Sequence, residues 1–200
     1  MSGSTTNKST AEATVEAGLD ALGALAHETK RLAPQVAAVA RRYADVLRRG
    51  GMLYFCGNGG SAADAQHIAA EYVVRYAADR RPLAATALTT DASILTAAGN
   101  DLGFEQIFAR QVEAFCGPGD LLVIHSTSGE SPNVLAAAAI ARARGVPVVA
   151  FLGKGGGSLA RQVDEAIVVA SDVTSLVQAM HLALEHLIVE LVEDLVLGRS

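Results

Sequence analysis

The sequence is poor in cysteine and in aromatic residues: it has two cysteines, five phenylalanines, four tyrosines and no tryptophan in 200 residues. Cys56 and Cys116 stand in apolar runs and lack the close, even spacing of a disulfide framework or a zinc ribbon. Their placement excludes a small domain stapled by disulfides and indicates a reducing compartment. We therefore expect a cytoplasmic protein.

Charge is also sparse, at 18% of residues, and no dense basic stretch occurs. The formal net charge of −5 argues against a surface that coats nucleic acid or an anionic membrane. The longest nearly apolar stretch, residues 182–197, is interrupted by Glu185, Glu190 and other polar side chains. It does not supply the ~20 uncharged residues that span a bilayer. We expect a soluble protein that binds neither nucleic acid nor membrane.

Hydrophobic residues make up 50% of the chain, which excludes a disordered protein and provides a large core. A chain of 200 residues has the length of one ordinary domain. Residues 1–10 are polar and rich in Ser and Thr, without the apolar segment of a signal peptide. We predict a disordered tail over residues 1–10 and a single domain over residues 11–200.

Two amphipathic helical patterns open the chain, and short apolar runs then alternate with further helical patterns. This alternation, with continuously apolar strands, is typical of a parallel sheet covered by helices on both faces. The expected strands are residues 52–56, 85–88, 121–125, 146–152 and 165–170, and the expected helices are residues 15–26, 36–47, 61–76, 91–98, 103–115, 131–144 and 173–197.

The last predicted helix, residues 173–197, is apolar around almost its whole circumference. A helix of this kind must be buried on more than one side. Because two N-terminal helices are also available to cover the sheet, we expect part of this apolar surface to contact another subunit. The sequence therefore predicts a homo-oligomer.

Two predicted strands end in loops that can hold a ligand. GNGGS at residues 57–61 has glycines that let a ligand approach the backbone, and Ser61 suits a helix cap. Such a loop also occurs for steric reasons alone, so both interpretations stay open. STSGES at residues 126–131 has four hydroxyls, more than one N-cap at Ser131 requires. This excess predicts a phosphate site at a helix N-terminus.

Candidate metal ligands and acid–base groups lie on two predicted helices. His67 and Glu71 share a helix face at spacing i, i+4, and Arg75 continues that face by one turn. Such a pair often supplies two of the ligands of a zinc site, although the spacing alone is more typical of a solvent-exposed helix face. The last helix adds four polar groups to an apolar surface, and four together indicate a site, whereas one buried histidine is usually satisfied by a backbone carbonyl. These groups are Gln178, His181, Glu185 and His186.

Three motifs occur in a specific order: GNGGSAADAQHIAAE at residues 57–71, NDLGF at residues 100–104 and STSGESPNVL at residues 126–135. In combination they resemble the SIS-domain (sugar isomerase) family, and within it the phosphoheptose isomerases, which convert sedoheptulose 7-phosphate into glycero-manno-heptose 7-phosphate. The resemblance implies an enzyme with a flavodoxin-like three-layer sandwich. It would have a five-stranded parallel sheet, two N-terminal helices and a long C-terminal helix, and would form a homotetramer.

The resemblance also implies a role for individual side chains. A zinc cofactor would be held by His67, Glu71, Gln178 and His186. The phosphorylated substrate would be bound by Asn58, Gly59, Gly60, Arg75, Asn100, Asp101, Ser126, Thr127, Ser128, Ser131 and Gln178.

Moving a ketose carbonyl from C2 to C1 requires proton transfers through an enediol, which is general acid–base work. Glu71 is the candidate base and His186 the candidate acid, and zinc would stabilise the enediolate as a Lewis acid. The assignment of both Gln178 and His186 to one ion has a geometric difficulty. On a straight helix the backbones of Gln178 and His186 are ~12 Å apart, so both reach one ion only if the helix is distorted or the side chains lean together.

The chain departs from the family pattern at three positions: Ala179 after the ligand glutamine, Ser175 in place of an acidic residue, and Glu130 in the phosphate loop. A carboxylate beside a phosphate weakens binding unless it points outward. Two alternatives therefore stay open: an isomerase of another phosphorylated ketose, and a non-catalytic SIS protein that binds a sugar phosphate or a partner protein.

Overall fold

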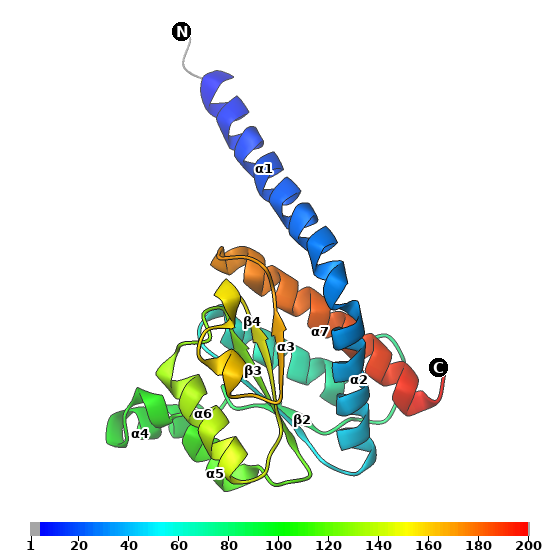
Figure 1. The fold of residues 1–200 in the computed structure, drawn as a ribbon, viewed down its shortest axis with the longest axis vertical. Coiled ribbons are helices and arrows are strands. Elements are labelled where there is room, and N and C mark those ends of the chain that lie inside the picture. The colour runs from blue at the N-terminus through cyan, green and yellow to red at the C-terminus, as the bar shows by residue number, and fades with distance from the viewer. Residues whose placement is uncertain (1–4, 200) are drawn as a thin grey trace.

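The computed structural model describes the backbone of residues 5–199 and the side chains of residues 10–199. Its centre is a five-stranded parallel sheet with the strand order β2-β1-β3-β4-β5 (Figure 1). This order is the flavodoxin-like one. The strands are β1 (Leu53–Gly57), β2 (Ala85–Ala87), β3 (Leu121–Ser126), β4 (Val148–Leu152) and β5 (Glu165–Val168), each within a predicted strand or one residue beyond it.

The strands end together at one edge of the sheet. Gly57 at the end of β1 lies beside His125 of β3, and His125 lies beside Phe151 of β4. β1, β3 and β4 are buried along their whole length. The loops that follow β1 and β3 therefore leave the sheet side by side, as expected for parallel strands.

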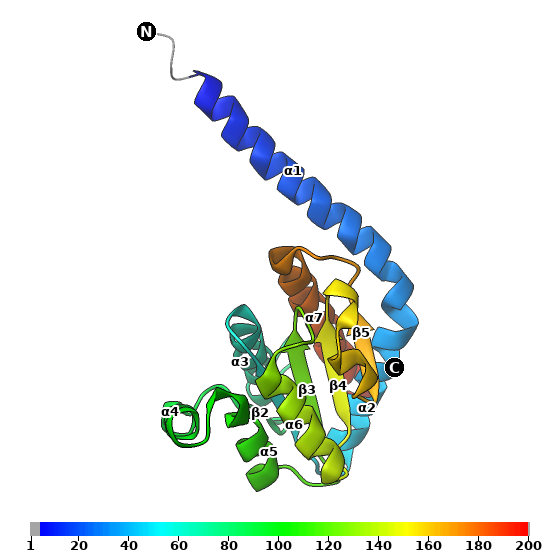
Figure 2. The same ribbon diagram turned by 60° about the vertical axis from the view of Figure 1, so that its left-hand side comes forward.

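Helices cover both faces of the sheet, which confirms the three-layer sandwich. Figure 2 shows α6 in front of the sheet, with α7 and α2 behind it. One layer contains α2 (Ala33–Arg48), α3 (Gly60–Val73) and α7 (Thr174–Leu197), and the other contains α4 (Ala92–Asp101), α5 (Ala109–Phe115) and α6 (Pro132–Ala143).

Several helix limits differ from those predicted. α1 (Thr5–Thr29) extends beyond residues 15–26 at both ends, α3 ends at Val73 instead of Tyr76, and two further differences involve glycines. Gly99 does not end α4, which continues to Asp101, because one helical glycine costs only about 1 kcal/mol. The helix predicted over residues 103–115 is divided into a 3₁₀ turn at Phe104–Gln106 and α5. Gly103 precedes that turn with a φ of +93°, a conformation outside the helical region.

The first helix, α1 (Thr5–Thr29), extends away from the body of the protein, and a 3₁₀ turn at Lys30–Leu32 joins it to α2 (Figure 1). Both predicted N-terminal helices are therefore present. Of the predicted tail, residues 1–4 lie outside the described residues, whereas residues 5–10 belong to α1. The domain limits at residues 1–10 and 11–200 stay a prediction.

Within the described residues, α7 is the helix long and apolar enough to cross a membrane. A core helix of a soluble protein passes the same test, and α7 packs against α2 and α3 in one hydrophobic cluster. It also buries three polar side chains, His181, Glu185 and Glu193. These contacts describe a helix of a protein core.

Candidate active site

The loop between β1 and α3 is built from glycines. The N-cap of α3 is Gly59, with φ +57° and ψ −121°, and it makes no side-chain capping bond. Ser61 lies inside the helix and is buried, so the expectation that it caps α3 is wrong. A Cβ atom at Gly60 would lie 2.4 Å from Nε2 of Gln178. Glycine is therefore required here so that α7 can approach the loop.

The loop after β3 uses two of its serines internally. The Ser126 hydroxyl accepts a hydrogen bond from Gly129 N–H at 3.0 Å, and the Ser128 hydroxyl accepts one from Glu130 N–H at 3.2 Å. Each hydroxyl keeps its own proton for donation to a ligand. Ser131 is the N-cap residue of α6 but makes no side-chain capping bond. Capping therefore does not consume the hydroxyls of this loop.

Glu130 is bound by a neighbouring loop. Its Oε1 atom accepts a hydrogen bond of 2.6 Å from Ser158 N–H. Gly129 lies against the same loop, because a Cβ atom there would be 2.1 Å from the Gly156 carbonyl oxygen. The glycine-rich turn after β4 thus supports the STSGES loop and engages the carboxylate that departs from the family pattern.

The two loops and the start of α7 enclose a cavity of about 270 Å³. Eight of the predicted substrate-binding residues line it, together with Ser61, His125 and Thr174. The eight are Asn58, Gly59, Gly60, Ser126, Thr127, Ser128, Ser131 and Gln178.

The other three predicted substrate-binding residues lie outside this cavity. Asn100 and Asp101 are exposed on the last turn of α4, where the Asn100 amide donates to the Asp101 carboxylate at 2.7 Å. Arg75 is exposed, and α3 ends at Val73, so the expectation that Arg75 continues the helix face is wrong. Contact of these three with a substrate stays a prediction.

The structure brings together three of the four predicted metal ligands. Nε2 of His67 lies 3.0 Å from Nε2 of His186 and 3.4 Å from Oε1 of Glu71. One ligand atom from each of these residues falls within 4.8 Å of the others. The ring of Tyr76 stacks on His186, with centroids 5.6 Å apart and an interplanar angle of 19°. The cluster joins α3 to α7.

Gln178 and His181 occupy different surroundings on α7. The Gln178 amide lies against Gly60, in the cavity beneath the two loops. His181 is fully buried, and its Nε2 lies 3.1 Å from the Leu152 carbonyl oxygen. Burial and, next, the nearby His125 lower the pKa of His181 to about 3, so the ring is neutral near pH 7. This is the arrangement expected of a core histidine.

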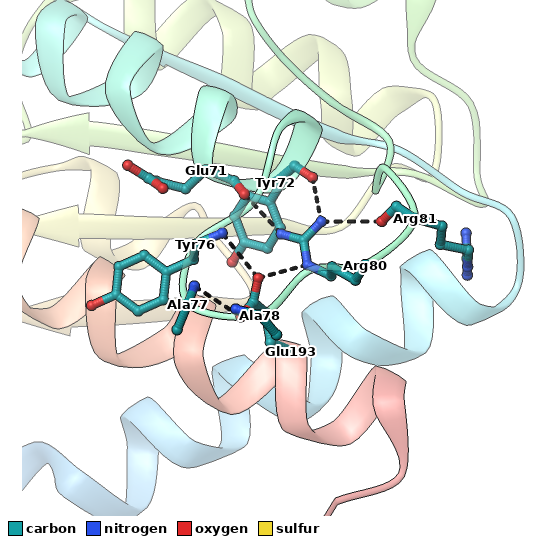
Figure 3. Close-up of polar contacts among 8 residues, drawn as sticks. All are labelled: Glu71, Tyr72, Tyr76, Ala77, Ala78, Arg80, Arg81 and Glu193. Carbon is teal, nitrogen blue, oxygen red and sulfur yellow. Dashed lines mark hydrogen bonds and ion pairs between the residues drawn. The ribbon is translucent and has the colours of Figure 1, made fainter.

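An ion pair that the sequence did not reveal holds the C-terminal end of α3 (Figure 3). Nε of Arg80 donates to Glu193 at 2.7 Å, and the rest of the guanidinium donates to the carbonyls of Glu71, Tyr72 and Arg81 at 2.8, 2.9 and 3.2 Å. These bonds satisfy carbonyl groups that a helix end leaves free. The last turn of α3, which carries Glu71, is thereby held in place.

Glu193 also fixes the segment after α3. Its two oxygens accept hydrogen bonds from the N–H groups of Tyr76, Ala77 and Ala78 at 3.0, 3.1 and 2.9 Å (Figure 3). Burial raises the pKa of Glu193, but the bonds from these N–H groups and from Arg80 outweigh it and lower the pKa below its usual range. The Glu193 carboxylate is therefore ionised near pH 7. Its hydrogen bond from the Tyr76 N–H helps to hold the Tyr76 ring beside His186.

Comparisons with known proteins identify the family of this chain. Residues 19–153 match the SIS domain family. A phosphoheptose isomerase of Rhodospirillum rubrum is 54% identical over 162 residues, which cover 81% of this chain and 86% of that protein. The solved structure of a phosphoheptose isomerase from Neisseria gonorrhoeae has 37% identity and a TM-score of 0.86, and that from Francisella tularensis has 32% and 0.89. Each covers 92% of this chain and 98% of the solved one. The chain therefore belongs to the SIS domain family and, within it, to the phosphoheptose isomerases, a group of phosphosugar isomerases.

Proposed function

We propose that this chain converts sedoheptulose 7-phosphate into glycero-manno-heptose 7-phosphate with the help of a zinc ion. The observation that carries this proposal is the placement of two sites along α3. The hydroxyl-lined cavity lies at its N-terminus near Gly60, and His67 begins the cluster about 10 Å further along the helix axis. A sugar with its phosphate in the cavity extends its carbonyl end toward the cluster.

The phosphate is bound by the loop over residues 126–131. The hydroxyls of this loop and the free N–H groups at the start of α6 are donors suited to an anion. Glu130 does not compete, because its carboxylate is engaged by Ser158 N–H. The departure at Glu130 is therefore compatible with a phosphate ligand.

Glu71 and His186 carry out the proton transfers. Glu71 removes a proton from C1 of the ketose while His186 donates a proton to the C2 oxygen, which yields an enediol. Glu71 then returns the proton to C2, and His186 takes the proton of the C1 hydroxyl, so the carbonyl moves to C1. Each residue has a second oxygen or ring nitrogen, so it can bind an ion with one atom and transfer a proton with the other.

A zinc ion fits the cluster of His67, Glu71 and His186. Two imidazoles and one carboxylate are one of the three-ligand sets found in catalytic zinc sites, which keep one position open for substrate. When bound there, the ion supplies Lewis-acid stabilisation of the enediolate. Gln178 stays a predicted fourth ligand, and its side chain would have to leave Gly60 to reach the ion.

The function is tested by incubating the purified protein with sedoheptulose 7-phosphate, with shorter ketose phosphates, and with each after treatment with a chelator. We expect turnover of the seven-carbon sugar that disappears with the chelator and returns with zinc. Turnover of a shorter sugar alone would assign a different substrate. Binding of sugar phosphates without turnover, with zinc present, would instead indicate a non-catalytic SIS protein.

Ser128→Ala should weaken substrate binding by about tenfold or more. The substitution removes a hydroxyl that lines the cavity, and a hydrogen bond to a charged group contributes roughly 1.5–3 kcal/mol. KM and the affinity for inorganic phosphate are the quantities to measure. Ser93→Ala, on exposed α4, is the matched control. Unchanged KM and kcat in Ser128→Ala would show that the phosphate binds elsewhere.

The protein should form a homotetramer through α1 and α7. Val15 and Leu19 on α1 and Leu187 and Leu191 on α7 are exposed by 62%, 63%, 52% and 40%. An apolar groove of about 590 Å³ lies between α7 and the α1–α2 corner. An apolar groove flanked by four exposed aliphatic side chains is typical of a surface that another subunit covers.

Light scattering should therefore give four times the chain mass of 20.6 kDa. Leu187→Glu should shift the protein to smaller species, because a carboxylate would be buried without a partner. A particle of one chain mass at micromolar concentration would contradict the tetramer. The cytoplasmic location stays a prediction, in keeping with two free, buried cysteines.

A further inference from the structure

A buried polar pair joins the sheet to α7 close to the proposed site. The two ends of that site are the phosphate cavity, which His125 helps to line, and the cluster of His67, Glu71 and His186. His125 and Glu185 are both 0% exposed, and Nε2 of His125 lies 3.1 Å from Oε1 of Glu185. The Tyr43 hydroxyl lies 3.4 Å from the same oxygen. The proton transfers proposed above use neither residue, and aliphatic side chains would fill the same core space.

The pair joins the segments that carry the two ends of the site. His125 directly precedes Ser126, where β3 passes into the phosphate loop, and its ring is held between Phe55, Phe151 and His181. Glu185 directly precedes His186 on α7, whose ring contacts His67. The hydrogen bond between His125 and Glu185 thus connects the end of β3, just before the phosphate loop, with α7, one residue before His186.

Stability alone does not explain the contact between His125 and Glu185. Among the described residues, Nδ1 of His125 and Oε2 of Glu185 have no hydrogen-bond partner, nor do the Tyr72 hydroxyl and Nδ1 of His181. Buried polar atoms without partners are unfavourable, and apolar replacement of a buried pair is often neutral or stabilising. The pair is better explained by a positional role: it holds β3 and α7 in one relative arrangement.

We propose that His125 and Glu185 are positioning residues that set the phosphate loop and His186 at the separation one sugar phosphate requires. The inference rests on the proposed function, because it assumes a ligand that reaches both ends. A fixed separation favours a ligand that spans the two ends and has no effect on a ligand that occupies one end alone. This difference distinguishes positioning from general support of the fold.

The test is the double variant His125→Leu/Glu185→Leu, which removes the link and leaves an apolar core. We expect its melting temperature to equal or exceed that of the parent. The affinity for Zn²⁺ should stay within about twofold of the parent. The affinity for inorganic phosphate, measured separately, gives the direct effect of replacing His125, which also lines the cavity, and should change less than the affinity for the sugar phosphate. The affinity for sedoheptulose 7-phosphate should fall about tenfold, and kcat should fall by roughly 10- to 100-fold.

Two single variants complete the design. Glu185→Gln keeps an oxygen that accepts a hydrogen bond from His125, so it should bind the sugar phosphate like the parent. Tyr43→Phe removes the hydrogen bond from the Tyr43 hydroxyl to Glu185, keeps the link to His125, and should also behave like the parent. If the double variant does not fold, His125→Asn replaces it, because the shorter amide does not span the gap to Glu185.

The outcomes separate this inference from the proposed function. Parent-like binding of the sugar phosphate and parent-like turnover in the double variant would overturn the inference, as would an equal loss of affinity for all three ligands. Loss of sugar-phosphate binding in Glu185→Gln would also overturn it. If the parent binds sedoheptulose 7-phosphate without converting it, the proposed function fails, while the pattern of the three affinities still decides the inference.

Discussion

Glu71→Gln is expected to lower kcat by roughly 10²- to 10⁴-fold, the range typical of a lost general base. The amide keeps the shape of the side chain and retains an oxygen that can bind an ion, but it does not accept the proton from C1. Glu71 lies partly exposed at the cluster, so the substitution leaves the core unchanged. Steady-state kinetics should show the loss mainly in kcat, with little change in KM.

His186→Asn should cause a similar loss, because it removes the acid. His181→Asn should affect turnover only mildly, because His181 binds the Leu152 carbonyl and packs against the rings of His125 and Phe151, and does not belong to the cluster of His67, Glu71 and His186. More than about a tenth of the parent activity in Glu71→Gln would mean that the base lies elsewhere. Equal damage at His181 and His186 would mean that the face of α7 has been assigned wrongly.

Arg80→Met is expected to lower the free energy of unfolding by about 3–5 kcal/mol, the effect of removing one partner from a buried ion pair. The side chains of Arg80 and Glu193 are 0% and 3% exposed, and the loss of Arg80 also frees the carbonyls of Glu71 and Tyr72. Urea denaturation measures the change. Arg110→Met, which breaks an exposed pair with Glu113, is the matched control and should lower it by less than ~1 kcal/mol.

The pair also has a pH dependence with a defined sign. Because the pKa of Glu193 is lowered in the folded state, its contribution to stability is present above the unfolded pKa of ~4.3 and is lost as pH falls below it. Glu193→Gln should therefore lose stability at pH 7 and show a flatter dependence below about pH 4.3. A parent-like slope in Glu193→Gln, or a parent-like stability in Arg80→Met, would contradict a stabilising role of this pair.

Most of the fold was predictable because its signals are local. Each strand is a short apolar run, and a buried parallel strand needs no more than that. Two of the misplaced boundaries fall at glycines, whereas the end of α3 at Val73, before the predicted Tyr76, does not. Gly99 was expected to end α4 but is helical, whereas Gly103, with its positive φ, lies at a real interruption. Glycine permits both conformations, so packing decides between them.

The candidate site was predictable where its residues are close in sequence. The GNGGS and STSGES loops were found because glycines and hydroxyls directly follow buried strands, and His67 and Glu71 because they share a helix face. The ion pair of Arg80 with Glu193 was not predictable, because 113 residues separate the two and neither belongs to a distinctive sequence pattern. Glu130 appeared unfavourable in sequence because its partner, Ser158, comes from a loop after another strand.

The sequence by itself determined the parallel sheet, the two loops at its edge and the types of side chain available for chemistry, since each follows from the order of neighbouring residues. The tertiary structure decided which of those side chains meet. It placed His186 against His67, and it placed His181, five residues earlier on the same helix, against the Leu152 carbonyl. The physical reason is that a helix presents its residues in several directions, and only the packing of α7 between α2, α3 and the sheet selects the one that faces the site.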